Sequence, residues 1–180
     1  MHKRLFIAVP LSPSFVRAFE AYQMQHPFPW VRWIPAENVH ITLYFLGEVD
    51  NEKVPDIRAR LRKVIAEQSP FSLTFQKLDF GPPPGPPRMI WAYFATSTDY
   101  RRLVEAVSFA LKPFVYRASR KELIPHVTLA RFKTDADPPR IQLCPMVPEE
   151  KGLRVSSCDL LESQLTPTGS LYTRVQSFSL

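Results

Sequence analysis

The sequence predicts an α+β fold in which two similar lobes face each other across a central cleft. Patterns typical of strands and of helices follow one another along the chain. A phrase of the form His-x-Thr-Leu occurs twice, at residues 40–43 and 126–129, each time inside an apolar, β-branched run. The 180 residues, of which 45% are hydrophobic, suffice for a packed core, and we expect one bilobal domain over residues 1–180.

The first half of the chain is predicted to alternate strands and helices. Ser12 followed by Pro13 is typical of a helix N-terminus, and Pro27 and Pro29 stop that helix. Apolar residues at helical spacing predict a second helix, and alternating Phe71, Leu73 and Phe75 predict a strand after it. The expected elements are a strand at 5–9, a helix from 13 to about 25, a strand at 39–46, a helix at 54–67 and a strand at 71–80.

The second half begins with Gly-Pro-Pro-Pro-Gly-Pro-Pro at residues 81–87. We expect this segment to be a stiff loop between two strands; a polyproline ligand for an aromatic groove is the alternative. The further expected elements are a strand at 88–95, a helix at 100–111, a strand at 124–132, a polar connection at 134–151, and a closing hairpin of strands at 153–165 and 171–178. Each half then carries a helix and one His strand.

The two phrases predict matching chemical faces on two strands. On average residue usage, a given His precedes x-Thr-Leu on the order of once in several hundred, yet two of only four histidines do so here. Because side chains alternate across a strand, His40 and Thr42 share one face, and so does Tyr44. His126 and Thr128 likewise share a face, whereas the same counting turns Arg131 away from it. Two lobes facing each other would bring both His-x-Thr faces into one site.

Net charge and cysteine usage narrow the class of protein. The formal net charge is +6, and a basic cluster surrounds the second phrase: Lys112, Arg117, Arg120, Lys121, Arg131 and Lys133, against one acid, Glu122. The cluster favours an anionic ligand; a solvated surface loop is the alternative. No run of 18 apolar residues and no signal-peptide cleavage site occur, so we expect a cytoplasmic protein with no membrane segment. Cys144 and Cys158 are expected to be free thiols, with a disulfide as the alternative.

Two imidazoles and two hydroxyls together suit phosphoryl chemistry. Near pH 7, one His can be neutral and act as a general base while the other is protonated and acts as a general acid. Two Thr hydroxyls can hold phosphoryl oxygens for in-line attack, as hydrolysis of a strained cyclic phosphodiester requires. No His-x-His, His-Glu-x-x-His or paired-Cys spacing predicts a metal site, no Gly-x-Ser-x-Gly predicts a serine hydrolase, and no Gly-rich loop predicts an ATPase. We therefore expect no metal and no cofactor.

The paired phrases resemble those of the 2H phosphoesterase superfamily, and specifically its RNA 2′,3′-cyclic phosphodiesterases of the LigT/ThpR type. The resemblance extends over nearly the whole chain, through residues 4–9, 38–49, 125–131 and 161–167 with Gly169 and Tyr172. It implies a bilobal α+β fold whose antiparallel sheets line a central cleft, with the helices outside. It also implies that the substrate is RNA with a 2′,3′-cyclic phosphate terminus, or a cyclic nucleotide, and that the protein is a monomer without an obligate protein partner.

The resemblance also implies a role for each site residue. His126 would activate water, His40 would protonate the ribose 3′-oxygen to leave a 2′-phosphate, and Thr42 and Thr128 would grip the phosphate. Arg131, five places after the second His, would join them, which requires a bulge or a strand end near Ala130. Tyr44 stands where many relatives have Arg or a small residue; it is expected either to stack on a nucleobase or to pack in the cleft.

Three alternatives remain beside cyclic phosphodiester hydrolysis. Both histidines can be structural strand residues, although the matched pair argues against this. The cleft can belong to a non-catalytic module that binds RNA ends. A superfamily enzyme can also act on 2′,5′-linked oligonucleotides or join RNA ends in a 2′-5′ ligation.

Overall fold

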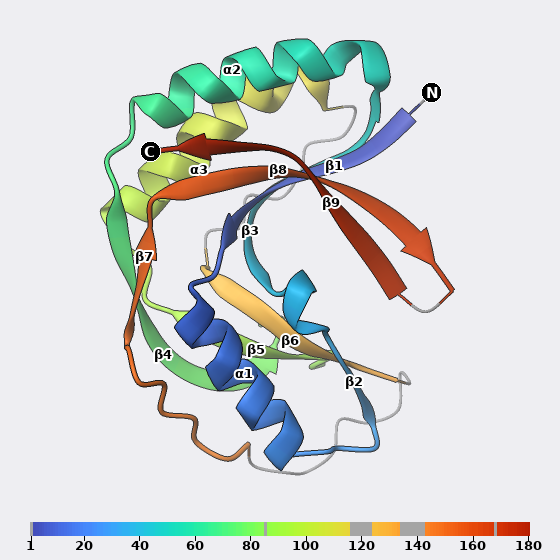
Figure 1. Cartoon of the computed structure of the whole chain (residues 1–180), viewed down its shortest axis with the longest axis vertical. Helices are drawn as coiled ribbons and strands as arrows, with labels where there is room; N and C mark the ends of the chain where they lie inside the picture. Colours follow the sequence, from blue (N-terminus) through green and yellow to red (C-terminus); the bar gives the residue numbers. More distant parts are fainter. Residues whose placement is uncertain (1, 85, 116–123, 134–142, 168) are drawn as a thin grey trace.

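The computed structural model describes residues 2–84, 86–115, 124–133, 143–167 and 169–180. Nine strands and three α-helices lie within these residues (Figure 1). They are β1 (His2–Pro10), α1 (Pro13–Gln25), β2 (Val31–Trp33), β3 (His40–Asp50), α2 (Val54–Ala66), β4 (Phe71–Gly81), β5 (Met89–Phe94), α3 (Thr98–Leu111), β6 (His126–Phe132), β7 (Gly152–Val155), β8 (Ser157–Thr166) and β9 (Gly169–Ser179). None of the helices in this described part combines the length and apolar character needed to span a bilayer.

The strands form one curled sheet in the order β7-β4-β5-β6-β3-β1-β8-β9, with β2 beside β6. All recorded pairings are antiparallel. One lobe consists of β1, β3, β8 and β9, and the other of β2 and β4–β7. They join where β3 meets β6, with Ile41 directly opposite Val127. The predicted bilobal α+β fold is confirmed, and the sheets of its two lobes are continuous across this junction.

The helices cover the outside of the sheet (Figure 1). Helices α2 and α3 pack on each other and on the lobe that contains β3 and β9, and their buried residues recur at helical spacing, as Ile57, Leu61 and Ile65 do in α2. Helix α1 packs on the other lobe, where the ring of Phe15 lies 5.4 Å from that of Phe94. Each phrase strand is therefore backed by an apolar core, which leaves its opposite face for the cleft.

The structure confirms most expected elements and corrects two. The segment after Gly81 is the loop between β4 and β5, as expected, and both cysteines are free. The predicted strand at 153–165 is wrong as one element, because the chain changes sheet partners at Ser156: β7 pairs with β4, whereas β8 pairs with β1 and β9. Strand β2 was not expected. Residues 116–123 of the basic cluster and residues 134–142 of the polar connection lie outside the described residues.

Candidate active site

Two matched bulges shape the strands that carry the histidines. In β3, Thr42 and Tyr44 lie opposite consecutive residues of β1, so Leu43 is an extra residue in the pairing. In β6, Thr128 and Ala130 lie opposite consecutive residues of β5, so Leu129 is extra in the same way. Both bulges fall at the Leu of the repeated phrase. Each one reverses the alternation beyond it, so the side chain five places after each His returns to the His face.

The bulge in β6 brings Arg131 into the site. Simple alternation turned Arg131 away from His126, whereas the family resemblance placed it in the site. An irregularity in the strand near Ala130 was needed to reconcile these two expectations. The structure has that irregularity at Leu129, and Arg131 lines the same pocket as His126 and Thr128. The role of Arg131 in phosphate binding stays a prediction.

The bulge in β3 has the opposite effect on Tyr44. Tyr44 was expected on the His40 face, and this expectation is wrong: its side chain is 4% exposed and belongs to the hydrophobic core. Phe45 is 43% exposed and lines the pocket instead. The error has one physical cause, because counting alternate residues through the extra Leu43 inverts the two faces.

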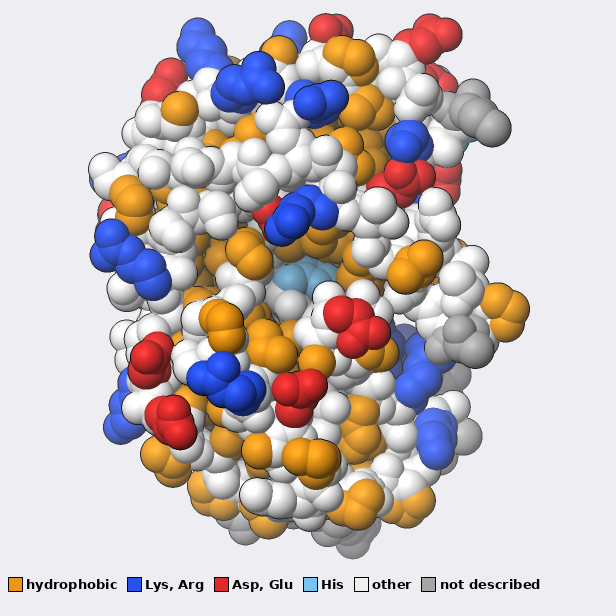
Figure 2. All heavy atoms as spheres, viewed as in Figure 1, with side chains coloured by type: hydrophobic (Ala, Val, Ile, Leu, Met, Phe, Trp, Pro, Cys, Tyr) orange, Lys and Arg blue, Asp and Glu red, His pale blue; other side chains and the backbone are white. Residues whose placement is uncertain are grey.

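A single pocket in the centre of the molecule is lined by residues of both phrases. Figure 2 shows histidine side chains in the hollow between the two halves of the molecule, where this pocket has a volume of about 160 Å³. Because β3 and β6 are antiparallel with Ile41 opposite Val127, His40 lies across from Thr128 and Thr42 from His126. The pocket is lined by Ile34, Asn38, His40, Thr42, Phe45, Met89, Trp91, His126, Thr128, Arg131 and Tyr172. Of the predicted site residues, all but Tyr44 meet here.

Both imidazoles are held in the same way by the chain that precedes them. Nδ1 of His40 lies 2.7 Å from the carbonyl oxygen of Asn38, and Nδ1 of His126 lies 2.8 Å from that of Ile124. A carbonyl oxygen can only accept, so each Nδ1 carries a hydrogen and donates it. In the neutral rings, Nε2 is then the nitrogen with the free lone pair. In His40, Nε2 lies 3.1 Å from the hydroxyl oxygen of Thr42.

Burial keeps the two imidazoles neutral. The pKa of His40 is lowered to about 4, chiefly by burial; the bond to the Asn38 carbonyl opposes this shift, and the neighbouring Arg131 and the charged form of His126 add to it. Burial also lowers the pKa of His126, and the bond to the Ile124 carbonyl again opposes it. At pH 7 the pocket thus holds two neutral bases beside the positive charge of Arg131. An anion that enters would stabilise the protonated form of either imidazole.

Trp91 supports His126 from one face, a contact that the sequence did not predict. Their ring centroids are 3.6 Å apart and their planes differ by 16°. Trp91 in turn lies against Gly81, where an added Cβ would approach the indole to 2.4 Å, so only glycine fits there. The stack therefore depends on the position of the end of β4.

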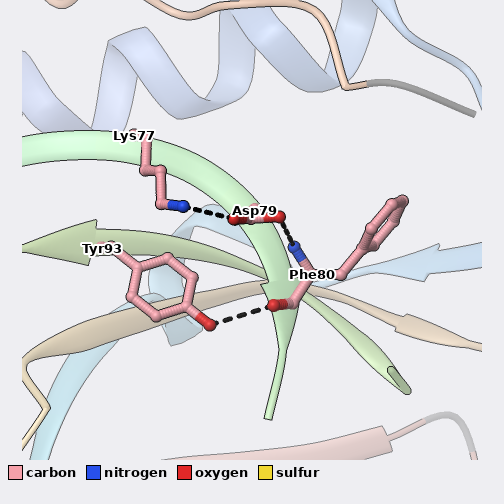
Figure 3. Close-up of polar contacts among 4 residues, drawn as sticks. All are labelled: Lys77, Asp79, Phe80 and Tyr93. Carbon is pink, nitrogen blue, oxygen red and sulfur yellow. Dashed lines mark hydrogen bonds and ion pairs between the residues drawn. The ribbon is translucent and has the colours of Figure 1, made fainter. Parts of the chain in front are cut away.

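Polar contacts fix that end of β4 (Figure 3). Tyr93 donates its hydroxyl hydrogen to the Phe80 carbonyl over 3.0 Å, and Asp79 accepts from the Phe80 amide over 2.8 Å and from Lys77 over 2.5 Å. Burial, and secondarily the Asp79 charge, raises the pKa of Tyr93 to about 12, so its hydroxyl remains a donor. These contacts hold Gly81 against Trp91 and thereby the orientation of His126.

The sulfur of Met89 gathers three donors at the floor of the pocket. It accepts from Trp91 Nε1 over 3.4 Å, from an Arg131 guanidinium nitrogen over 3.6 Å and from the Thr128 hydroxyl over 4.0 Å. A thioether is a weak acceptor. The Thr128 hydroxyl and the Arg131 guanidinium can therefore turn to a stronger acceptor at little cost, and the oxygens of an anion are such acceptors.

Sequence comparisons relate this chain to known proteins. The family model described as LigT like Phosphoesterase matches residues 9–91. A Thermus thermophilus protein named RNA 2′,3′-cyclic phosphodiesterase is 33% identical over 187 residues, which cover 98% of this chain and 90% of that protein. An Archaeoglobus fulgidus protein of the same name is 31% identical, with 97% of this chain and 99% of that protein covered.

Solved structures extend the likeness to the fold. A crystal structure of a Thermus thermophilus protein superimposes with a TM-score of 0.83 at 30% identity, covering 98% of this chain and 97% of that one. Escherichia coli LigT complexed with NADP+ gives a TM-score of 0.82 at 23% identity, covering 100% of this chain and 99% of that one, and shows the shared fold. The chain belongs to the LigT-like phosphoesterase family, as its paired His-x-Thr-Leu phrases indicated.

Proposed function

We propose that this protein hydrolyses the 2′,3′-cyclic phosphate ends of RNA to 2′-phosphomonoesters by two-histidine acid–base catalysis without a metal. The observation that carries the proposal is the single pocket that His40 and His126, each bonded through Nδ1 to a backbone carbonyl, line together with Thr42, Thr128 and Arg131. The names of the Thermus and Archaeoglobus relatives support the substrate class. Both halves of the pocket come from one chain, in keeping with a monomer.

In the proposed reaction, one histidine accepts a proton from water and the other donates a proton to the leaving oxygen. Thr42, Thr128 and Arg131 hold the non-bridging phosphoryl oxygens, which positions phosphorus and stabilises the charge of the transition state. Nε2 of His126 removes a proton from water as its oxygen bonds to phosphorus. The bond from phosphorus to O3′ breaks in line, and Nε2–H of His40 gives its proton to O3′. This assignment of base and acid follows the family resemblance.

The protonation of His40 is coupled to the binding of substrate in this mechanism. Without a ligand the lowered pKa of His40 leaves it neutral at pH 7. A bound phosphate anion adds a negative charge beside the ring, raises its pKa and so supplies the general acid. Phe45 takes the part once expected of Tyr44: it lies exposed at the pocket wall, where its ring can stack on the terminal nucleobase.

Product analysis tests the proposed function directly. The protein is incubated with 2′,3′-cyclic AMP, and the two AMP isomers are separated by chromatography. Because the acid and the base stand at opposite ends of an in-line displacement, we expect 2′-AMP alone. Comparable yields of 2′-AMP and 3′-AMP would contradict fixed roles for the two histidines, and no turnover would contradict the function.

We expect EDTA to leave the rate of this reaction unchanged, because the sequence offers no metal-ligand spacing. Rates are compared before and after dialysis against EDTA. Loss of activity that a single divalent ion restores would overturn the metal-independent mechanism. Equal rates in the presence and absence of added Mg²⁺ serve as the companion measurement.

The pH dependence is expected to be bell-shaped and displaced to acid. The active form needs one neutral and one protonated imidazole, and both pKa values in the free protein lie below the ordinary value of about 6.5. The maximum of kcat/KM, which reports the free protein, should therefore lie below pH 6.5. The maximum of kcat should lie at higher pH, since bound phosphate raises both pKa values. A kcat/KM profile with a single limb would contradict the two-histidine mechanism.

A further inference from the structure

A second groove opens directly on the active-site pocket. It has a volume of about 370 Å³ and lies between β2 with the turn that follows it and the tip of the β8–β9 hairpin. It shares four lining residues with the pocket: Ile34, Asn38, Arg131 and Tyr172. A chain that leaves the pocket therefore has a continuous path into this groove, which is more than twice as large as the pocket itself.

The groove meets the pocket on the side of His40. The carbonyl oxygen of Asn38 accepts from His40 Nδ1, and the ring of Tyr172 stands edge-on to that of His40, with centroids 5.4 Å apart. In the proposed reaction His40 protonates O3′, so the ribose of the terminal nucleotide lies on this side. The nucleotides that precede it in an RNA strand would enter the groove.

Two arginines lie side by side at the groove without a carboxylate partner. Arg32 of β2 is directly opposite Arg131 of β6 in the strand pairing, and both line the groove. Like charges in opposite positions destabilise a sheet. Among the residues that the structure describes, neither guanidinium is within ion-pair distance of a carboxylate, and the exposed Glu37 on the groove wall does not pair with either. An anionic ligand is the partner that would relieve this repulsion.

The opposite wall offers apolar surface that is fixed in place. Leu171 is 53% exposed at the groove, and Tyr172 follows it at the boundary with the pocket. The Asn38 side chain donates to the carbonyl oxygen of Ser170 over 2.9 Å and so ties the start of β9 to the turn before His40. A rigid wall of this kind can receive the face of a base, while Arg32 faces its phosphate.

We propose that this groove binds the single-stranded RNA immediately 5′ of the cyclic end, with Arg32 at the phosphodiester that links the terminal nucleotide to its neighbour. The inference rests on the proposed function and adds to it a binding site for the nucleotides that precede the cyclic end. Positive charge beside a stacking surface, continuous with the site of cleavage, is the combination that binds single strands without regard to sequence.

The test compares two substrates in one set of variants. Values of kcat/KM are measured for 2′,3′-cyclic AMP and for a tetranucleotide that ends in a 2′,3′-cyclic phosphate. Arg32→Ala should lower the value for the tetranucleotide about tenfold at low salt and leave that for cyclic AMP unchanged. The slope of log kcat/KM against log salt should become shallower by about 0.7 for the tetranucleotide. Arg32→Lys should restore most of the loss.

The matched control is Arg62→Ala, which removes an exposed arginine from α2 on the outside of the molecule. This variant should behave as the wild type toward both substrates. Equal losses on both substrates in Arg32→Ala, or no loss on the tetranucleotide, would overturn the groove assignment while the proposed function stands. A wild-type protein that turns over neither substrate would refute the proposed function and the groove with it.

Discussion

His126→Ala and His40→Ala should each lower kcat for 2′,3′-cyclic AMP by about 10²–10⁴, the usual contribution of one general acid or base. His126 lies at the pocket with its Nδ1 held by the Ile124 carbonyl, and His40 is held in the same way by Asn38. Alanine removes Nε2 and leaves the backbone in place. The measurement is steady-state kinetics together with circular dichroism to verify folding.

His2→Ala is the matched control, because His2 lies at the exposed start of β1, with 62% of its side-chain surface accessible. We expect wild-type rates from it. The double variant His40→Ala, His126→Ala should be little slower than either single variant, since groups that act as a unit are not additive. A folded single variant with a near-native rate would rule out the two-histidine mechanism.

Tyr44→Ala should lower stability and Phe45→Ala should weaken substrate binding, although the two residues are neighbours. Tyr44 is buried, so its truncation leaves a cavity and should lower the free energy of unfolding by about 3–5 kcal/mol. Phe45 is exposed in the pocket, so its truncation should change that free energy by less than about 1 kcal/mol. Urea denaturation of both variants measures the difference.

The effect on KM should be large in Phe45→Ala and small in Tyr44→Ala, the reverse of the effect on stability. Loss of the Phe45 ring removes a stacking surface that is worth about 1–3 kcal/mol per base, which should raise KM for 2′,3′-cyclic AMP by roughly 5- to 160-fold. Tyr44→Ala, assayed below its unfolding midpoint, should keep a near-native KM. The exchanged pattern, with an unstable Phe45→Ala and a raised KM in Tyr44→Ala, would mean that β3 runs without its bulge.

The repeated phrase was enough to predict the bilobal fold and most of the site, because His and Thr two places apart share a strand face in any regular strand. The bulges were beyond that reasoning. Leu43, Tyr44 and Phe45 are all apolar, so their sequence does not reveal which of them faces the core. Alternation turned Arg131 away from the site, whereas the family resemblance placed it there. The bulge at Leu129 explains the difference.

Elements that depend on distant partners were missed for a related reason. Strand β2 has three residues, too few for a periodic pattern, and its pairing with β6 defines it. The exchange of partners at Ser156 leaves no turn signal, since β7 and β8 are both extended. The stack of Trp91 on His126 joins two strands that are far apart in the sequence, so no local pattern predicts it.

The matched bulges make the two halves of the cleft chemically different. The paired His-x-Thr faces, taken alone, are related by an approximate twofold through Ile41 and Val127, and a substrate could lie between them in either direction. The residue that each bulge returns to the cleft differs between the halves: an aromatic ring at position 45 and a guanidinium at position 131. On the proposed function, the base end of the substrate is drawn to one and the phosphate to the other. The one extra residue in each strand thus gives the two-fold site a single binding direction, in which only one ribose oxygen can face His40.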